Sequence, residues 1–252
     1  SHGTGRLGEW FGPIMLLWFV TLAVLGIRSA IQTPDVFVAF SPYHAVQFLL
    51  DHPTQGFAVL GSVFLVVTGA EALYVDMGHF GKSPIRLGWY CLVLPSLVLQ
   101  YLGQGALLIR QPEAVVNPFY LLAPTWFLLP LVVLATLATI IASQAMLSGA
   151  FSLTQQAIQL GYLPRMAIRY TSASQIGQIY LPAINMLMLI GTISLVLFFG
   201  TSSNLAAAYG IAVAGTMVIS TLLIFVVARR QWKWSWPLAG LVTGLFLTLD
   251  LS

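Results

Sequence analysis

Two carboxylates lie in the apolar stretch VVTGAEALYVDMGHFGKS at residues 66–83. Glu71 falls near the middle of a run apolar enough to cross a membrane, and Asp76 follows it towards one end. A charged side chain at the centre of a bilayer costs about 3 kcal/mol on insertion scales, and such residues usually face a cavity and mark ion or proton pathways. We therefore predict that Glu71 binds and releases a proton. The structural alternative is a protonated carboxyl group that only hydrogen-bonds a neighbouring helix.

The residues beside Glu71 supply further oxygen ligands. Thr68 lies three positions before Glu71, so the two share one face of a helix. Gly69 removes a side chain beside them and permits close approach or local unwinding. An interrupted helix at membrane depth frees carbonyl oxygens, and these coordinate small cations in secondary transporters. The segment therefore predicts a cation or proton pathway.

Asp76 belongs to a second polar group near the end of the same stretch, with His79, Lys82 and Arg86. A local polar cap or a salt bridge is the simpler role for this group. We keep Asp76 and Gly69 as additional candidates for the pathway.

The composition indicates a membrane protein. Hydrophobic residues make up 58% of the 252 residues and charged residues only 7%, with a mean hydropathy of +0.90. Soluble domains carry about a quarter charged residues, so this chain could not cover a water-exposed surface with polar groups. The single cysteine, Cys91, offers no disulfide framework and no thiol pair for a metal. We predict an all-α, polytopic membrane helical bundle.

Seven stretches are long and apolar enough to span a bilayer core, which takes about 20 helical residues. They are residues 11–31, 56–77, 85–109, 126–155, 179–200, 204–228 and 236–251. The fourth is longer than a bilayer requires, and we expect it to project beyond the membrane as an amphipathic tail. The chain opens without a methionine and stops inside an apolar run, so we expect residues 1–252 to be a fragment of one transmembrane transport domain.

The basic residues divide unequally if the spans alternate in direction. The side that holds the segment before the first span receives eight basic residues: Arg6, Lys82, Arg86, Arg165, Arg169, Arg229, Arg230 and Lys233. The opposite side receives only Arg28 and Arg110. Basic residues accumulate on the cytoplasmic side of membrane proteins. This pattern predicts a multi-pass membrane protein with the loops after spans two, four and six in the cytoplasm, and we expect that membrane to be the cell (inner) membrane.

Two further groups of residues stand out in the last two spans. Trp232, Trp234 and Trp236 lie beside Lys233, which is typical of an interfacial anchor, with a ligand cage as the alternative. The segment SNLAAAYGIAVAGTMV is rich in small residues, which suit close packing of helices in lipid. Tyr209 is the exception there, because its phenol has room to point a hydroxyl group into a cavity.

The sequence lacks the motifs of dinucleotide-binding, metal-binding and nucleic-acid-binding proteins and of potassium channels. GQGALL at Gly103 matches only the start of a dinucleotide-binding loop, and the four histidines have no metal-ligand spacing. The pI near 9.2 comes from dispersed basic residues rather than a patch for nucleic acid. The Tyr209–Gly210 pair alone does not make a potassium-channel filter. We predict no enzyme, no nucleic-acid partner and no cofactor.

Five long motifs occur along the chain: TGAEALYVDMGHFGKSPIRLGW, YLGQGALLI, NPFYLLAP, LATLATIIASQAMLSGAFSLTQQAIQLGYLPRM and SSNLAAAYGIAVAGTMV. On these motifs the chain closely resembles the bacterial branch of the Kup/HAK/KT potassium uptake permeases, from Phe11 into the last span. Small departures from the family's pattern stand at Val75, Gln155 and Ala214, and the last of these removes a hydroxyl group from the sixth span.

The resemblance implies the inverted-repeat fold of amino-acid/polyamine/organocation transporters, of which this chain covers about helices five to eleven. It implies uptake of potassium, by K⁺/H⁺ symport through alternating access. The partners it implies are potassium ions, protons, the lipid bilayer, and the helices one to four and C-terminal region that this chain lacks. A homodimer is one assembly that we consider.

The resemblance also assigns roles to residues by motif. Glu71 matches the family's sixth-helix glutamate, which is implicated in proton coupling. Thr68 matches a threonine that resembles a potassium ligand, and Tyr209 matches the tenth-helix tyrosine near the cation site. Asp250 falls near an acidic position of helix eleven and is a further pathway candidate.

Two other transport functions and one inactive state remain as alternatives. A permease of the same fold could move an amino acid or a polyamine, which would compete with potassium. A channel-like cation pathway would show flux far above transporter rates and no proton movement. The 252 residues alone would lack half of the implied site and could be inactive.

Overall fold

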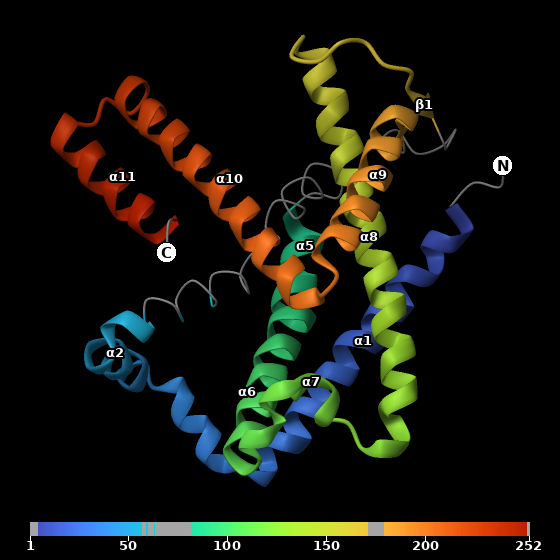
Figure 1. Cartoon of the computed structure of the whole chain (residues 1–252), viewed down its shortest axis with the longest axis vertical. Helices are drawn as coiled ribbons and strands as arrows, with labels where there is room; N and C mark the ends of the chain where they lie inside the picture. The colour runs from blue at the N-terminus through green and yellow to red at the C-terminus, as the bar shows by residue number, and fades with distance from the viewer. Residues whose placement is uncertain (1–4, 57–58, 60–62, 64–81, 171–178, 251–252) are drawn as a thin grey trace. The chain divides into compact units, whose positions relative to one another are not determined.

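The computed structural model describes residues 5–56, 59, 63, 82–170 and 179–250 (Figure 1). These residues are almost entirely helical, as the composition predicts. They form two compact units, the first drawn from residues 1–45 and 71–185 and the second from residues 46–70 and 186–252.

The elements, labelled as in Figure 1, follow in order along the chain. They are α1 (Gly5–Gln32), η1 (Pro34–Phe40), α2 (Pro42–Asp51), α5 (Lys82–Gly88), η2 (Trp89–Val93), α6 (Leu94–Arg110), η3 (Pro112–Val116), α7 (Pro118–Leu121), η4 (Thr125–Phe127), α8 (Leu128–Gln159), β1 (Arg169–Tyr170), β2 (Ile179–Tyr180), α9 (Pro182–Phe199), α10 (Ser202–Arg230) and α11 (Trp236–Asp250).

Five helical stretches in the described part are long and apolar enough to cross a membrane: Trp10–Gln32, Lys82–Arg110, Thr125–Gln159, Pro182–Phe199 and Ser202–Arg230. They coincide with five of the seven stretches expected from the sequence. The last expected span is the shorter apolar helix α11. Most of residues 56–77, the second expected span, lies outside the described residues.

The stretch Lys82–Arg110 contains one π-helical turn, η2, between α5 and α6. Pro95 lies in the first turn of α6 and has no backbone N–H, so it cannot donate the regular bond to the carbonyl of Cys91. A π-helical turn widens the helix at such a point and lets it continue across the proline.

The long helix α8 has 32 residues, which is about 48 Å at 1.5 Å per residue and exceeds a bilayer core of about 30 Å. Its end is a Schellman motif: Gly161 adopts φ +80°, Tyr162 N–H donates to Ala157 O at 2.9 Å, and Gly161 N–H donates to Ile158 O at 3.1 Å. Beyond this end, β1 and β2 pair antiparallel, with Arg169 opposite Tyr180.

A tight turn separates α9 from α10. Gly200 takes φ +66°, and the Thr201 hydroxyl then caps α10 by accepting from Asn204 N–H at 3.3 Å. A threonine at this position satisfies one of the unpaired N–H groups of the first helical turn. The glycine turn and the threonine cap therefore separate α9 from α10 close to the boundary between the two expected spans, residues 179–200 and 204–228.

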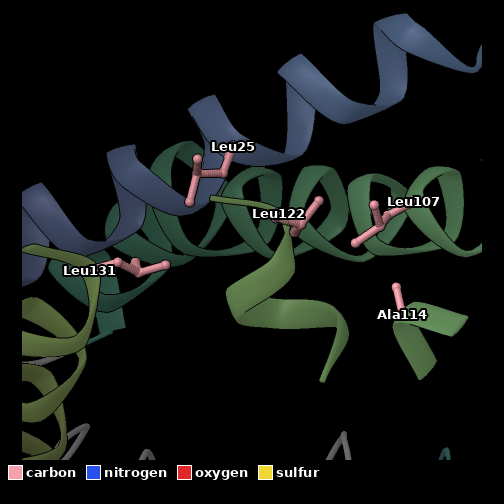
Figure 2. Close-up of a cluster of buried hydrophobic side chains, with 5 residues drawn as sticks. All are labelled: Leu25, Leu107, Ala114, Leu122 and Leu131. Atoms are coloured by element: carbon pink, nitrogen blue, oxygen red, sulfur yellow. The ribbon is translucent and has the colours of Figure 1, made fainter. Parts of the chain in front are cut away.

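The largest buried cluster lies in the first unit and joins segments far apart in the sequence. Figure 2 shows its side chains approaching from α1, α6, η3, the residue after α7, and α8; they are Leu25, Leu107, Ala114, Leu122 and Leu131. The short elements η3 and α7 therefore fold back against α1 and α6 between the long apolar helices.

Candidate functional site

The carboxylate group that motivated the pathway prediction lies outside the described residues. Thr68, Gly69, Glu71 and Asp76 all fall within residues 64–81, about which the structure makes no statement. Their roles stay predictions from the sequence and from the family resemblance. The two other candidates, Tyr209 and Asp250, are both described.

Asp250 is buried between α10 and α11. The residue is only 5% exposed, and its carboxylate accepts a hydrogen bond from the Thr221 hydroxyl of α10 at 2.7 Å. The other carboxylates whose side chains are described, Asp35, Asp51 and Glu113, are exposed. Asp250 is thus the one buried carboxylate in the described part of the chain.

The position of Asp250 along α11 can be compared with the thickness of a bilayer. It lies fourteen residues beyond Trp236, which is about 21 Å along a helix axis. If Trp236 stands at the headgroup level, Asp250 lies inside a hydrocarbon core of about 30 Å. An ionisable group at that depth usually faces the bundle interior or a cavity and has a function.

Tyr209 lies on the same helix as Thr221, but at a different level. Twelve residues separate the two, which is about 18 Å along the axis of α10. Tyr209 is 45% exposed in the described structure. The structure therefore does not bring Tyr209 and Asp250 into one site.

Among the described residues, the long helices α1 and α6 approach each other so closely that their backbones touch. A Cβ atom added to Gly26 would lie 2.2 Å from Leu99 O, and one added to Gly103 would lie 2.5 Å from the Cα atom of Gly26. Only glycine permits this backbone contact, which is a recurrent way of packing helices in lipid. The Ser29 hydroxyl donates to Gly103 O at 2.8 Å and adds a buried hydrogen bond to the contact.

Arg110, at the end of α6, binds the C-terminal end of α1 through hydrogen bonds. Its Nη1 donates to Ser29 O at 3.0 Å and to Thr33 Oγ1 at 2.9 Å, and its Nη2 donates to Ser29 Oγ at 3.3 Å. The Ser29 carbonyl is among the last four of α1, which have no regular helical partner. A cation near a helix C-terminus is also favoured by the helix dipole. Arg110 is therefore a structural clamp.

Gln100 is the unexpected member of the same interface. It is 3% exposed, and neither its Oε1 nor its Nε2 has a hydrogen-bond partner among the described residues. Ser96, one helical turn earlier on α6, is equally buried. An amide buried without partners costs about 1–3 kcal/mol, so Gln100 is a weak point of this packing.

The described residues contain no group of three or more His, Cys, Asp or Glu side chains that could hold a metal ion. The potassium ion of the sequence prediction would be transported cargo, held by hydroxyl, carbonyl and carboxylate oxygens, and needs no such cluster. Among the described residues, Thr221 of α10 and Asp250 of α11 form a side-chain hydrogen bond between these two helices.

Sequence reasoning missed two contributors to these contacts, Thr221 and Arg110. Thr221 looks like any other hydroxyl group of an apolar helix, since such groups usually bond to their own backbone. From the sequence Arg110 is only a basic residue in a predicted loop. It lies 77 positions from Thr33, so the contact between them could not be predicted without the packing of α1 on α6.

Comparison with known proteins identifies relatives over the whole chain. A family model described as "K+ potassium transporter integral membrane domain" matches residues 1–252. Proteins named "Probable potassium transport system protein Kup" are similar to the full length of the chain. One from Methylococcus capsulatus is 62% identical over 252 residues, covering 40% of that protein, and one from Bdellovibrio bacteriovorus is 59% identical over 252 residues, covering 38%.

The chain spans about two fifths of the length of these curated relatives. No solved structure matches it. The family match and the apolar helices confirm the predicted class, an all-α, multi-pass membrane protein. The predicted inverted repeat remains a prediction.

Proposed function

This chain belongs to the K⁺ potassium transporter family, and on that premise we propose that it forms part of a secondary transporter that takes up potassium ions. The observation that carries the proposal is the match of the family model to every residue of the chain. The family is one of transporters and not a class of enzymes. The five bilayer-length apolar helices agree with such a role.

The proposed mechanism is K⁺/H⁺ symport by alternating access. Potassium loses its water to hydroxyl, carbonyl and carboxylate oxygens at a site near the membrane midplane, with Thr68 and Tyr209 among the ligands. Protonation of Glu71 relieves charge repulsion and permits the inward movement. Release of the proton on the cytoplasmic side frees both ions. Broken helices in inverted-repeat transporters supply such oxygens.

Asp250 has a secondary place in this proposal. Its burial and its hydrogen bond from Thr221 at 2.7 Å support a pathway role, because a carboxylate at that depth is costly without one. Its distance from Tyr209 along the helices argues for a separate position along the pathway rather than for the same ion site.

The proposed orientation follows the charges. The three basic residues at the α10–α11 turn lie on the side that receives eight basic residues in all, and the positive-inside rule makes that side cytoplasmic. The relatives that the chain resembles come from bacteria, and for that reason we place the protein in the cell (inner) membrane.

The experiment uses a chimera in which this chain replaces the matching 252 residues of the Methylococcus capsulatus relative. The chimera is expressed in a bacterium that lacks its own potassium uptake systems, and growth is measured at limiting potassium. The parent chimera is expected to restore growth, whereas Glu71→Gln is expected to lower potassium uptake at least tenfold and to abolish its dependence on pH. Glu113→Gln, which makes the same change at an exposed carboxylate, should behave as the parent.

Each outcome has a defined meaning. Rescue by Glu71→Gln with unchanged pH dependence would remove the proton role and leave potassium uptake. Competition of an amino acid or a polyamine with potassium would favour another substrate. Flux without proton movement, far above transporter rates, would favour a channel. Absence of rescue by an inserted parent chimera would contradict the function itself.

A further inference from the structure

The turn between α10 and α11 carries positive charge that no carboxylate of its surroundings in the sequence can balance. Arg229, Arg230 and Lys233 lie within five consecutive positions. The sequence has no acidic residue between Glu113 and Asp250, and Asp250 lies at the far end of α11. No acidic residue nearby in the sequence therefore offsets these cations, and they are open to an external anion.

The three cations differ in what they contact. The guanidinium of Arg229 lies over the ring of Trp236, 4.2 Å from its centroid, and donates to Trp234 O. The Nε atom of Arg229 is buried. Arg229 is therefore turned inward and holds the turn in shape. Arg230 and Lys233 are exposed.

The backbone presents Lys233 outward at the tip of the turn. Trp232 N–H donates to Val227 O at 3.2 Å, and Trp234 N–H donates to Ala228 O at 3.0 Å, so both flanking residues are tied to the last turn of α10. Lys233 between them adopts φ +57°, a left-handed conformation that residues with side chains adopt at a cost. The lysine at this position places a charged side chain where glycine would be the least strained residue.

The aromatic residues place these cations at a membrane surface. The rings of Trp232 and Trp234 lie 5.5 Å apart, and Trp232 and Trp236 are 55% and 68% exposed. Indole rings favour the headgroup region, and two apolar helices end together at this turn. The charges therefore stand at the level of lipid phosphates.

We propose that the α10–α11 turn binds the phosphate-bearing headgroup of an anionic phospholipid through Arg230 and Lys233. Arg229 and Trp236 position the turn, and Trp232 packs against the glycerol region of the same lipid. The inference is independent of the transported ion, because it rests only on charge, exposure and the membrane level of the turn.

The experiment measures lipid binding to the chimera in a neutral detergent by native mass spectrometry. Phosphatidylglycerol and phosphatidylcholine with the same acyl chains are titrated separately. Each basic residue near an anionic surface contributes about fivefold in affinity, so Arg230→Gln/Lys233→Gln is expected to weaken phosphatidylglycerol binding about 30-fold. Binding of phosphatidylcholine should stay within about twofold, because this lipid carries no net charge.

Two further variants distinguish a specific lipid-binding site at this turn from nonspecific attraction between basic residues and anionic lipids. Arg165→Gln/Arg169→Gln removes the same charge from two exposed residues of another loop, and phosphatidylglycerol binding should stay within about twofold. Arg230→Lys/Lys233→Arg keeps the charge and should keep the affinity. An equal loss in both charge-removing variants, no loss in either, or an equal loss in the charge-preserving variant would overturn the proposal.

Discussion

The helix pairs α1–α6 and α10–α11 pack in different ways. At the first, backbones touch at Gly26 and Gly103, and Ser29 and Arg110 add hydrogen bonds across the interface. At the second, one hydrogen bond at depth, from Thr221 to Asp250, accompanies the cation–π contact at the turn. The first pair has the features of a rigid support, and the second leaves a carboxylate with a single identified hydroxyl donor.

The apolar helices also differ in how much of their surface is buried within this chain. One third of the most apolar stretch of α1 and of the α5–α6 helix is buried, against 6% for α10 and none for α9. In lipid an exposed apolar face costs nothing, because acyl chains are as apolar as leucine. Within this chain, the contacts between helices are therefore concentrated in the α1–α6 pair.

The largest expected effect comes from glycine substitution, because it tests where backbones touch. Gly26→Ala is expected to lower the free energy of unfolding by about 3 kcal/mol, since its Cβ atom would lie 2.2 Å from a carbonyl oxygen of α6. Gly215→Ala on α10, where no described atom lies within 4 Å of the added Cβ, should be neutral or stabilise by up to about 1 kcal/mol. The measurement is SDS-induced unfolding of the chimera. Equal losses at both positions would show that α10 is packed as closely as α1.

A smaller effect is expected at the polar clamp. Arg110→Gln removes a guanidinium that makes three hydrogen bonds to α1 and its end, and we expect a loss of about 1.5 kcal/mol in the free energy of unfolding. Arg28→Gln, at the other exposed basic residue predicted for that side of the membrane, should change the free energy by less than about 0.5 kcal/mol. If both variants unfold alike, net charge rather than the clamp stabilises this end.

The smallest effect is expected at Gln100, although Gln100 is buried and Arg110 is exposed. Gln100→Met removes an amide that has no hydrogen-bond partner among the described residues, so the free energy of unfolding should be unchanged or rise by about 1 kcal/mol. Ser29→Ala breaks a hydrogen bond that exists and should cost about 1 kcal/mol in the same unfolding assay. A loss above about 2 kcal/mol for Gln100→Met would reveal a partner for the amide outside the described residues.

Much of the helical architecture could be predicted from composition and from residues that end helices. Five expected spans coincide with apolar helices, and Pro34, Gly161 and Gly200 lie at their ends. These signals are local: proline and glycine act on the backbone within one turn. The interpretation of Glu71 and Thr68 as pathway residues came from depth and motif, and the described residues leave it a prediction.

The positions where helices pack closely could not be predicted from the sequence pattern. The sequence pattern favoured close packing in the small-residue segment of α10, yet Gly215 has no described neighbour within 4 Å of an added Cβ, and the backbone contact occurs at Gly26 and Gly103. Glycine content alone does not distinguish a position that meets another helix from one that meets lipid. Both are compatible with a regular helix.

The sequence by itself determined that this chain crosses a membrane as helices, roughly where they begin and end, and which family it belongs to. The tertiary structure alone decided that Ser29 meets Gly103, 74 positions away, and that Thr221 meets Asp250, 29 positions away. The reason is physical. A helix in water must turn its apolar face inward, but a helix that is apolar on all sides in lipid has no such constraint, so only the fit of backbones and a few polar groups selects its neighbours.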